Sequence, residues 1–415
     1  MFDLIIVLSV VCYALVLAWA ITGIRRASQG PSEKRAPVIA SIKNLFRHNL
    51  RTQFSNGSLR HDGESSPCGN FRHGFEPVES FRSPSRDEGD ASPPVSVMIA
   101  ARNEAHQLDE LLCCLQRQTL PVEHFQVNII DDRSADNTTG VVHRFRDKLP
   151  LNYLRVETVP SRYSPKKFAI ASGIEQAKFD VIILTDADCR PGPAWLNSMT
   201  AKFEHSVAAV IGYSPVTSTN QRLASVLNID SLAVAAACIA ACGWQNAYLA
   251  TGRNLAYRKS AFQRVNGFDG IAALVSGDDD LLIQKFWRSR VGKIIFNFDP
   301  ASQVASFGPS SLRTWLAQKR RHLSAGRHYP AKVQIGYLLY HAANLILWLA
   351  PLVLGLIGIV CWVAKLCGDY LLLKHTATRL RCRIDPAAFL IWQFCFLFIH
   401  CTLGPFAFVG RVRWK

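Results

Sequence analysis

Two pairs of carboxylates stand where predicted β-strands end. Asp131 and Asp132 directly follow an apolar strand predicted over 126–130, and Asp186 and Asp188 follow one predicted over 181–185. Carboxylates at a strand end can accept hydrogen bonds from a ribose or a base edge. Two carboxylates separated by one small residue can also share a hard cation such as Mg²⁺ or Mn²⁺, which would neutralise a diphosphate leaving group. The alternative for each pair is a polar turn that caps the next helix.

Two further clusters each gather charges of one sign. The sequence Gly277-Asp278-Asp279-Asp280 holds three adjacent carboxylates, whose mutual repulsion is costly without a task or a cation. One of them could take the proton from an acceptor hydroxyl; the alternative is a helix N-terminus, which acidic residues favour. The sequence QKRRH, from Gln318 to His322, precedes a long apolar stretch. Its arginines could bind a diphosphate by paired hydrogen bonds, or they could simply flank a membrane segment.

The elements that must position these clusters alternate between strands and helices. Strands are predicted at 95–100, 126–130, 153–157 and 181–185, and helices at 104–118, 136–147 and 166–177. This alternation predicts an α/β domain with a mostly parallel sheet and helices on both faces. Ligands of such sheets bind beyond the carboxyl ends of the strands, where the first two clusters lie.

An apolar run at residues 4–23 is long enough to cross a bilayer. The preceding residues Met1-Phe2-Asp3 lack the positive charge that opens a signal peptide, which favours an uncleaved anchor at 1–26. Arg25 and Arg26 follow the run, so the positive-inside rule predicts a cytoplasmic catalytic domain. Residues 27–93 are polar and without periodic pattern, and we predict a largely disordered linker.

The C-terminal region, residues 331–415, holds two more apolar stretches, at 334–363 and 386–409. Five basic residues between them form a predicted loop: Lys365, Lys374, Arg379, Arg381 and Arg383. If each stretch spans the membrane once, this loop lies outside, against the positive-inside rule. A break at Pro351 would instead make the first stretch re-entrant and return the loop to the cytoplasm. Both topologies remain open.

The chain is basic, with a formal net charge of +16. No zinc-finger, helix-turn-helix or aromatic RNA-binding pattern accompanies this charge, and we expect no nucleic-acid partner. Much of the excess flanks the apolar segments, which favours a membrane surface as partner. The 12 cysteines have no regular spacing, which is typical of reduced thiols in a cytoplasmic domain.

Taken in order, the clusters resemble the family 2 glycosyltransferases of the GT-A fold, over a domain predicted at 94–330. The matching segments are PVSVMIAARNE from Pro94, DDRSADNT from Asp131, PKKFAIASG from Pro165, TDAD from Thr185, TGRNLAYR from Thr251 and QKRRH from Gln318. The last resembles the QxxRW motif of processive members, but His322 stands at the tryptophan position. The apolar segment 223–242 predicts a buried helix; the placement of this segment in the family suggests an interfacial helix beside the acceptor entrance instead.

The resemblance also implies roles for single residues. Asp132, with Asp131, Glu104, Lys166 and Asp186, would hold the nucleotide-sugar. Asp188 would bind Mg²⁺ or Mn²⁺ with help from Asp186. The general base would be Asp278, counting back from the following leucine, or Asp279, reading the motif as GDD. Contacts with the acceptor or diphosphate would come from Asn254, Gln318, Arg320 and Arg321.

The expected function is inverting, hexosyltransferase-like transfer from a nucleotide-sugar to a lipid or membrane-bound acceptor. The expected place is the inner or plasma membrane, with the catalytic domain in the cytoplasm. One alternative is a processive polysaccharide synthase, which the replaced tryptophan disfavours. Another is a non-catalytic membrane partner of a glycosylation complex, which the intact acidic motifs disfavour.

Overall fold

The computed structural model describes residues 2–29, 92–309 and 311–404. The polar linker predicted at 27–93, apart from its ends, and the last residues of the stretch predicted at 386–409 lie outside the described residues.

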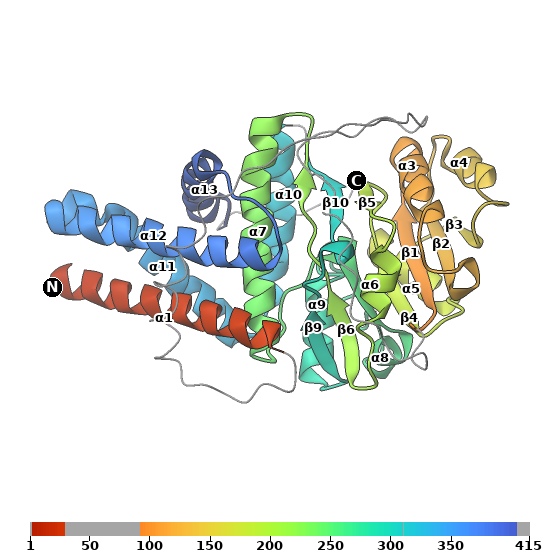
Figure 1. Cartoon of the computed structure of the whole chain (residues 1–415), viewed down its shortest axis with the longest axis horizontal. Helices are drawn as coiled ribbons and strands as arrows, with labels where there is room; N and C mark the ends of the chain where they lie inside the picture. The colour runs from red at the N-terminus through yellow and green to blue at the C-terminus, as the bar shows by residue number, and fades with distance from the viewer. Residues whose placement is uncertain (1, 30–91, 310, 405–415) are drawn as a thin grey trace, which may run out of the picture. The chain divides into compact units, whose positions relative to one another are not determined.

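A seven-stranded sheet forms the centre of the domain predicted at 94–330 (Figure 1). Its order is β3-β2-β1-β4-β8-β6-β9, and β8 runs antiparallel to both of its neighbours while the other pairs are parallel. The strands are β1 Val95–Ala101, β2 Phe125–Asp132, β3 Leu151–Val156, β4 Val181–Leu184, β6 Val207–Ile211, β8 Leu255–Arg258 and β9 Lys293–Phe296. The predicted parallel sheet is therefore confirmed, with one antiparallel strand added.

Helices connect the strands and cover both faces of the sheet. Each packs the apolar residues of one side against a sheet face. Two core clusters result, one on each face of the sheet. The connecting helices are α3 Ala105–Gln116, α4 Thr138–Arg144, α5 Pro165–Glu175, α6 Trp195–Thr200, α8 Lys259–Arg264 and α9 Asp280–Arg288. A small sheet of order β5-β10-β7 lies beside them, built from β5 Cys189–Pro191, β7 Val216–Thr217 and β10 Val304–Phe307.

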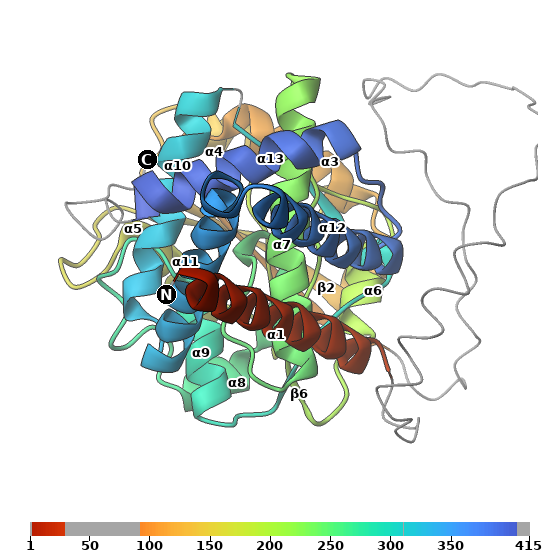
Figure 2. The same ribbon diagram turned by 90° about the vertical axis from the view of Figure 1, so that its left-hand side faces the viewer.

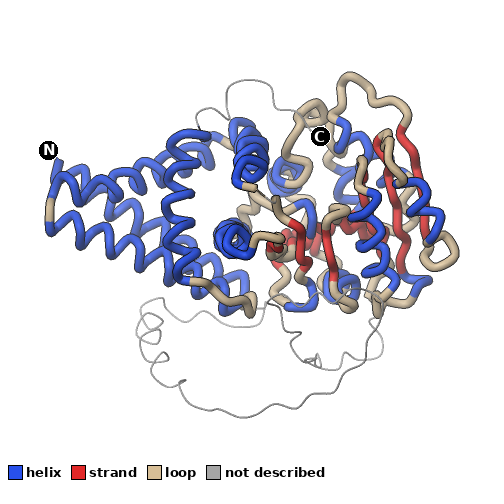
Figure 3. The backbone as a smooth tube through the Cα atoms, turned by 90° about the horizontal axis from the view of Figure 1, so that it is seen from above, coloured by secondary structure: helices blue, strands red, loops and turns tan. Residues whose placement is uncertain are grey.

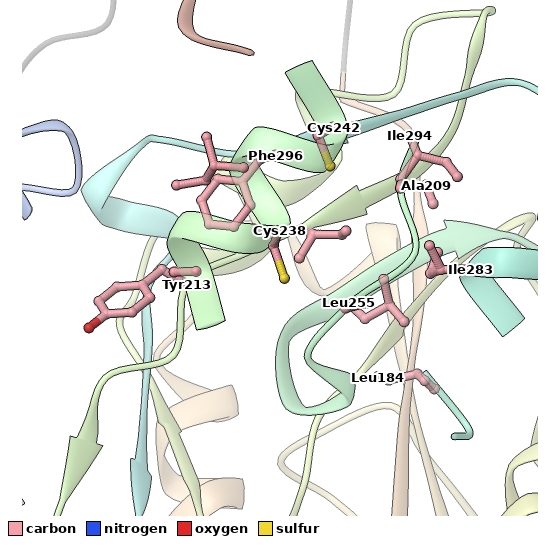
Figure 4. Close-up of a cluster of buried hydrophobic side chains, with 14 of the residues drawn as sticks. Leu184, Ala209, Tyr213, Cys238, Cys242, Leu255, Ile283, Ile294 and Phe296 are labelled. Atoms are coloured by element: carbon pink, nitrogen blue, oxygen red, sulfur yellow. The ribbon is translucent and has the colours of Figure 1, made fainter. Parts of the chain in front are cut away.

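Helix α7, Gln221–Gly243, packs on the sheet as the sequence predicted for a buried helix. Figure 4 shows Cys238 and Cys242 of α7 among Leu255 of β8 and Phe296 of β9. Although α7 is apolar and long enough to span a membrane, it carries no exposed large hydrophobic side chain. It therefore belongs to the core, and it separates the sheet from three long helices (Figures 1 and 3).

Those three helices are α1 Phe2–Ser28, α11 Ala331–Leu354 and α12 Leu356–Arg379, and they run alongside one another away from α7 (Figures 1 and 2). With α13, Pro386–Phe398, and its π-helical continuation Ile399–Leu403, they carry all but two of the exposed large hydrophobic side chains of the described residues. Counting α7, five helices in the described part of the chain are long and apolar enough to cross a membrane.

Close backbone contact fixes α1 against α7. A Cβ atom added to Gly243 would lie 1.8 Å from the carbonyl oxygen of Gly23, so only glycine allows this approach. Beside this contact, Trp244 Nε1 donates a hydrogen bond of 2.9 Å to the carbonyl of Trp19. The guanidinium of Arg26 stacks on the Trp244 ring, 3.7 Å from its centroid.

The C-terminal region differs from the sequence prediction. The stretch predicted at 334–363 is divided between α11 and α12, which form a hairpin, and residues predicted as a basic loop extend α12 to Arg379. The chain turns at Gly355, whose φ of +54° is open to glycine at little cost. Pro351 lies inside α11 and does not end it. Consequently the basic end of α12 returns to the sheet, where Gln303 Nε2 donates to the Leu380 carbonyl at 2.6 Å.

Candidate active site

The site lies where the strand order reverses, between β1 and β4, at the carboxyl ends of the parallel strands. Open α/β sheets bind ligands at such a point. A small pocket opens here, lined among others by Met98, Lys166, Asp186, Gly252 and Asp278. We call it the switch-point pocket. It gathers residues from five of the segments that the sequence analysis singled out.

The loops after β1 and β2 are linked to each other. Asn103 and Arg133 both adopt left-handed backbone conformations, with φ of 54° and 57°. Asn103 N donates to Ser134 Oγ at 2.9 Å, and Ala135 N donates to Asn103 Oδ1 at 2.8 Å. Ser134 therefore connects two loops rather than capping a helix, and sequence reasoning did not identify this role.

Asp131 and Asp132 are both fully buried but differ in their partners. Asp131 accepts hydrogen bonds from Ser134 N at 2.8 Å, Tyr153 OH at 2.7 Å and Arg155 Nη1 at 3.1 Å. Both oxygens of its carboxylate are thus hydrogen-bonded within the protein, and its predicted contact with the nucleotide stays a prediction. Asp132 binds Arg133 at 2.8 Å through Oδ1, while its Oδ2 has no hydrogen-bond partner in the described residues and only an ion pair with Arg102 at 3.5 Å.

Glu104 occupies the N-cap position of α3 without a side-chain capping hydrogen bond. The cap is supplied by Asp136, whose Oδ2 accepts from Ala105 N at 2.9 Å. Asp136 also accepts from Thr138 N at 3.1 Å, at the start of α4. Asp136 therefore accepts from the first residue of both α3 and α4.

Lys166 joins two of the predicted acidic clusters. From the first turn of α5, its Nζ lies 3.1 Å from Asp186 Oδ1 and 3.1 Å from Asp278 Oδ2. Burial opposes the charge on Lys166, but the carboxylates of Asp186 and Asp278 outweigh it and raise its pKa. Lys166 is therefore a permanent cation in the pocket. The three side chains are 20%, 39% and 12% exposed, so a ligand can reach them.

Asp186 and Asp188 both lie in the turn between β4 and β5, separated by the buried Ala187. Within the described residues, no group of three or more His, Cys, Asp and Glu side chains is placed to hold a metal ion. Two carboxylates nevertheless fit Mg²⁺ or Mn²⁺ in a site where phosphate oxygens and water complete the coordination. The residues present thus suit a cation that arrives with a diphosphate.

The three consecutive carboxylates of the acidic cluster have three different surroundings. Asp278 follows Gly277, whose φ is +82°, and lines the pocket beside Lys166. Asp279 is the N-cap of α9; it accepts from Asp280 N at 2.8 Å and Gly252 N at 2.9 Å. Asp280 accepts from Ala250 N at 2.8 Å and from Tyr329 OH at 2.5 Å. Only Asp278 of the three lines the pocket.

The pKa values of Asp278 and Asp279 are also shifted differently by their surroundings. Burial favours the neutral acid of Asp278, but the lysine charges of Lys166 and Lys167 lower its pKa. Burial and the neighbouring Asp278 raise the pKa of Asp279. The pKa values of the two adjacent carboxyls are thus shifted in opposite directions, and the two lysines favour the carboxylate form of Asp278.

Lys167 is a residue that sequence reasoning missed. Its side chain is 1% exposed, and its Nζ donates to the carbonyl oxygens of Leu274 at 2.5 Å and Ser276 at 2.8 Å. Burial lowers its pKa to about 8. The adjacent lysines of α5 therefore divide two tasks: Lys166 faces the pocket and Lys167 holds the loop that precedes Asp278.

Asn254, predicted to contact the acceptor or diphosphate, lies inside the core, and its contact with the acceptor stays a prediction. The side chain is fully buried, accepts from Trp195 Nε1 at 3.1 Å, and donates to the carbonyls of Tyr213 at 2.9 Å and Ser302 at 2.8 Å. Both amide protons and the amide oxygen are therefore engaged inside the protein. The strand that follows, β8, is likewise a central strand of the core.

Gln318, Arg320 and Arg321 lie on α10, Leu312–Ala325, which begins with a capping box between Ser311 and Thr314. Arg320 is exposed, and Gln318 and Arg321 are partly buried. Lys319 forms an ion pair with Asp230 of α7, which also accepts from Trp392 Nε1 of α13 at 3.3 Å. Asp230 lies within the predicted buried helix, and its carboxylate is thus paired with side chains of α10 and α13.

The fold and the pocket define an α/β protein of the GT-A class. The profile described as glycosyl transferase family 2 matches residues 96–265, and that described as glycosyl transferase family group 2 matches residues 181–409. The chain belongs to this family of glycosyltransferases.

The chain is also similar to individual proteins, at lower levels of sequence identity. The chain is similar to the probable glycosyltransferase YdaM of Bacillus subtilis, with 26% identity over 61% of this chain and 60% of that protein. It is also similar to an undecaprenyl-phosphate 4-deoxy-4-formamido-L-arabinose transferase of Pseudomonas syringae, with 31% identity over 24% of this chain and 29% of that protein. A mannosyltransferase structure from Pyrobaculum calidifontis is 18% identical, with a TM-score of 0.45 over 74% of this chain and 88% of that one. The chain thus spans less than two thirds of the length of either sequence relative.

Proposed function

We propose that the protein transfers a sugar, with inversion, from a nucleotide-diphosphate sugar to a lipid or membrane-bound acceptor. The observation that carries this proposal is the meeting of Asp186 and Asp278 at Lys166 in one pocket at the sheet's switch point. A carboxylate placed for a diphosphate-bound cation and a carboxylate placed for an acceptor hydroxyl thereby share one site.

Asp278 is the proposed general base. Its carboxylate takes the proton of the acceptor hydroxyl while the hydroxyl oxygen forms a bond to the anomeric carbon. The bond from the anomeric carbon to the diphosphate breaks, and the nucleoside diphosphate leaves on the opposite face. Asp279 and Asp280 do not serve, because their oxygens accept hydrogen bonds from backbone amides and from Tyr329.

Other residues handle the charge of the donor. Asp188 and Asp186 would hold Mg²⁺ or Mn²⁺, which would neutralise the charge of the diphosphate. Asp132 is proposed for the nucleoside, because its buried Oδ2 lacks a hydrogen-bond partner within the described residues. Lys166, and Arg320 and Arg321 of α10, are proposed to bind the diphosphate.

The apolar helices support the proposal of a lipid or membrane-bound acceptor. The exposed hydrophobic side chains of α1, α11 and α12 form the kind of surface that contacts a bilayer. The name of one similar protein, the Pseudomonas syringae transferase, includes undecaprenyl phosphate, a membrane lipid. We propose an integral protein of the inner or plasma membrane with its sheet in the cytoplasm.

The test is a panel of nucleotide-sugars supplied to purified membranes, with labelled lipid products separated by chromatography. Wild type is expected to transfer one sugar per acceptor in Mg²⁺ or Mn²⁺ and to lose transfer in a chelator. Asp188→Ala should lose transfer while folding and inserting normally. Asp109→Ala, which removes a surface carboxylate paired with Arg144, is the matched control and should remain active.

Full activity of the wild type or of Asp188→Ala in a chelator would contradict the metal role. A ladder of long sugar polymers would instead point to a processive synthase. Absence of transfer from every donor would contradict the proposed function.

A further inference from the structure

Asp280 lies two residues after the proposed base and outside the pocket, but it connects the base to a distant part of the chain. Its Oδ1 accepts from Ala250 N at 2.8 Å, and its Oδ2 accepts from Tyr329 OH at 2.5 Å. Ala250 belongs to the loop before β8, and Tyr329 lies between α10 and α11. The start of α9 is thereby tied to both segments.

Tyr329 is held in place by aromatic packing. Its side chain is 9% exposed, and its ring centroid lies 6.3 Å from that of Tyr248 and 6.5 Å from that of Tyr337. Tyr248 is fixed in turn by Gln284 of α9, whose Nε2 donates to its carbonyl at 2.9 Å. Leu281 of α9 packs in the same cluster. The packed aromatic rings therefore hold the hydroxyl of Tyr329 in position to donate to Asp280.

The two elements that meet here carry different parts of the proposed chemistry. The loop before α9 carries Asp278, and α10 carries Gln318, Arg320 and Arg321 and ends at Ala325, four residues before Tyr329. Aromatic packing alone would be satisfied by phenylalanine. The hydroxyl adds a directional bond to a carboxylate, and such charge-assisted bonds are shorter and stronger than neutral ones.

We propose that Tyr329 and Asp280 are positioning residues, which hold the base Asp278 and the cationic helix α10 at the separation that sugar transfer requires. This inference rests on the proposed function. A displacement of about 1 Å is enough to cost roughly 100-fold in rate when reacting groups must be aligned, so a bond at this junction can matter without touching substrate.

The test compares Tyr329→Phe with wild type in the transfer assay. Turnover is expected to fall about 10-fold to 100-fold, while the KM for the nucleotide-sugar changes less than about 2-fold, because donor contacts lie elsewhere. Tyr257→Phe is the matched control: this buried core tyrosine has a hydroxyl without a hydrogen-bond partner in the described residues, and its loss should leave turnover unchanged.

Asp280 gives a second, independent arm. Asp280→Asn can still accept from Ala250 N and can donate to the Tyr329 oxygen, so it should stay within about 5-fold of wild-type turnover. Asp280→Ala should lose at least as much turnover as Tyr329→Phe, because it also removes the bond to Ala250 N. The double variant should be no worse than Asp280→Ala, because the bond between the two residues is already absent in either single variant.

Wild-type turnover in Tyr329→Phe, or additive losses in the double variant, would overturn the inference and leave the proposed function standing. An equal loss in Tyr257→Phe would also overturn it, because a general disturbance of the core would then explain the result. An inactive wild type would remove the proposed function and this inference with it.

Discussion

At the scale of single residues, the acidic cluster shows how neighbours in sequence acquire separate tasks. Asp278 faces the pocket and a lysine, whereas Asp279 caps α9 and binds the Gly252 amide. The sequence motif alone fits either residue as base. The hydrogen bonds of Asp279 favour Asp278 as the base, because one oxygen of Asp279 caps α9 and the other accepts from the Gly252 amide.

We therefore predict that Asp278→Asn lowers turnover by about 100-fold or more while donor binding persists. Asp279→Asn should act mainly on stability, by about 0.5–2 kcal/mol as for other helix caps, because the amide replaces one accepting oxygen by a donor. Turnover, donor affinity and melting temperature of both variants distinguish the two effects. The reverse outcome, with turnover lost only in Asp279→Asn, would move the base to Asp279.

At the scale of elements, helix α5 positions the proposed base, Asp278, through its two adjacent lysines. Lys167 donates to two carbonyls of the loop that leads to Asp278, at 2.5 and 2.8 Å. Lys167→Met keeps a long side chain, but both carbonyls lose their hydrogen-bond donor. We predict a fall in turnover of about 10-fold or more, with a smaller change in stability, because removing a buried charge offsets part of the loss of hydrogen bonds. Unchanged turnover in Lys167→Met would show that the loop is held by other contacts.

The pH dependence of stability checks the same residue. Burial lowers the pKa of Lys167 to about 8, below the ordinary value of 10.5 for lysine. Between these two values the unfolded chain binds more protons than the folded chain, so this residue's contribution to stability rises with pH. The melting temperature of wild type relative to Lys167→Met should thus increase from about pH 8 toward pH 10. A difference that shrinks over this range would contradict the assignment.

At the scale of the whole molecule, the hairpin of α11 and α12 resolves a conflict in the distribution of charge. Two single spans would leave the basic residues near Arg379 on the side opposite to Arg25 and Arg26. In the structure α12 returns to the sheet, so its basic end and that of α1 lie on the same side (Figure 1). If α1, α11 and α12 cross a membrane, this arrangement satisfies the positive-inside rule without a re-entrant segment.

We predict that an epitope tag inserted at Gly355 and a tag inserted at 381–385 lie on opposite faces of the membrane. A tag in the exposed turn at 146–148 of the sheet domain marks the catalytic side and should react together with the 381–385 tag. Antibody access in sealed vesicles of both orientations is the measurement. Reaction of the Gly355 and 381–385 tags from one and the same face would contradict the hairpin topology.

The sequence by itself determined the family, the alternating fold and the neighbourhood of the site. Strand and helix periodicity are local; Asp132 and Asp186 lie at or just after strand ends, and Lys166 and Asp278 lie where the helices α5 and α9 begin. The parallel sheet brings these ends to one edge, so residues far apart in sequence were expected to meet there.

Only the tertiary structure decided which polar side chains face the pocket. Asn254 and Asp131 belong to matching motifs, yet their hydrogen bonds are satisfied within the protein by residues that no local pattern links to them. The partnership of Asp280 with Tyr329, 49 residues away, has the same origin. The hairpin depended on the left-handed conformation of Gly355, because an apolar run reports its hydrophobicity along the chain but not the place where the backbone reverses.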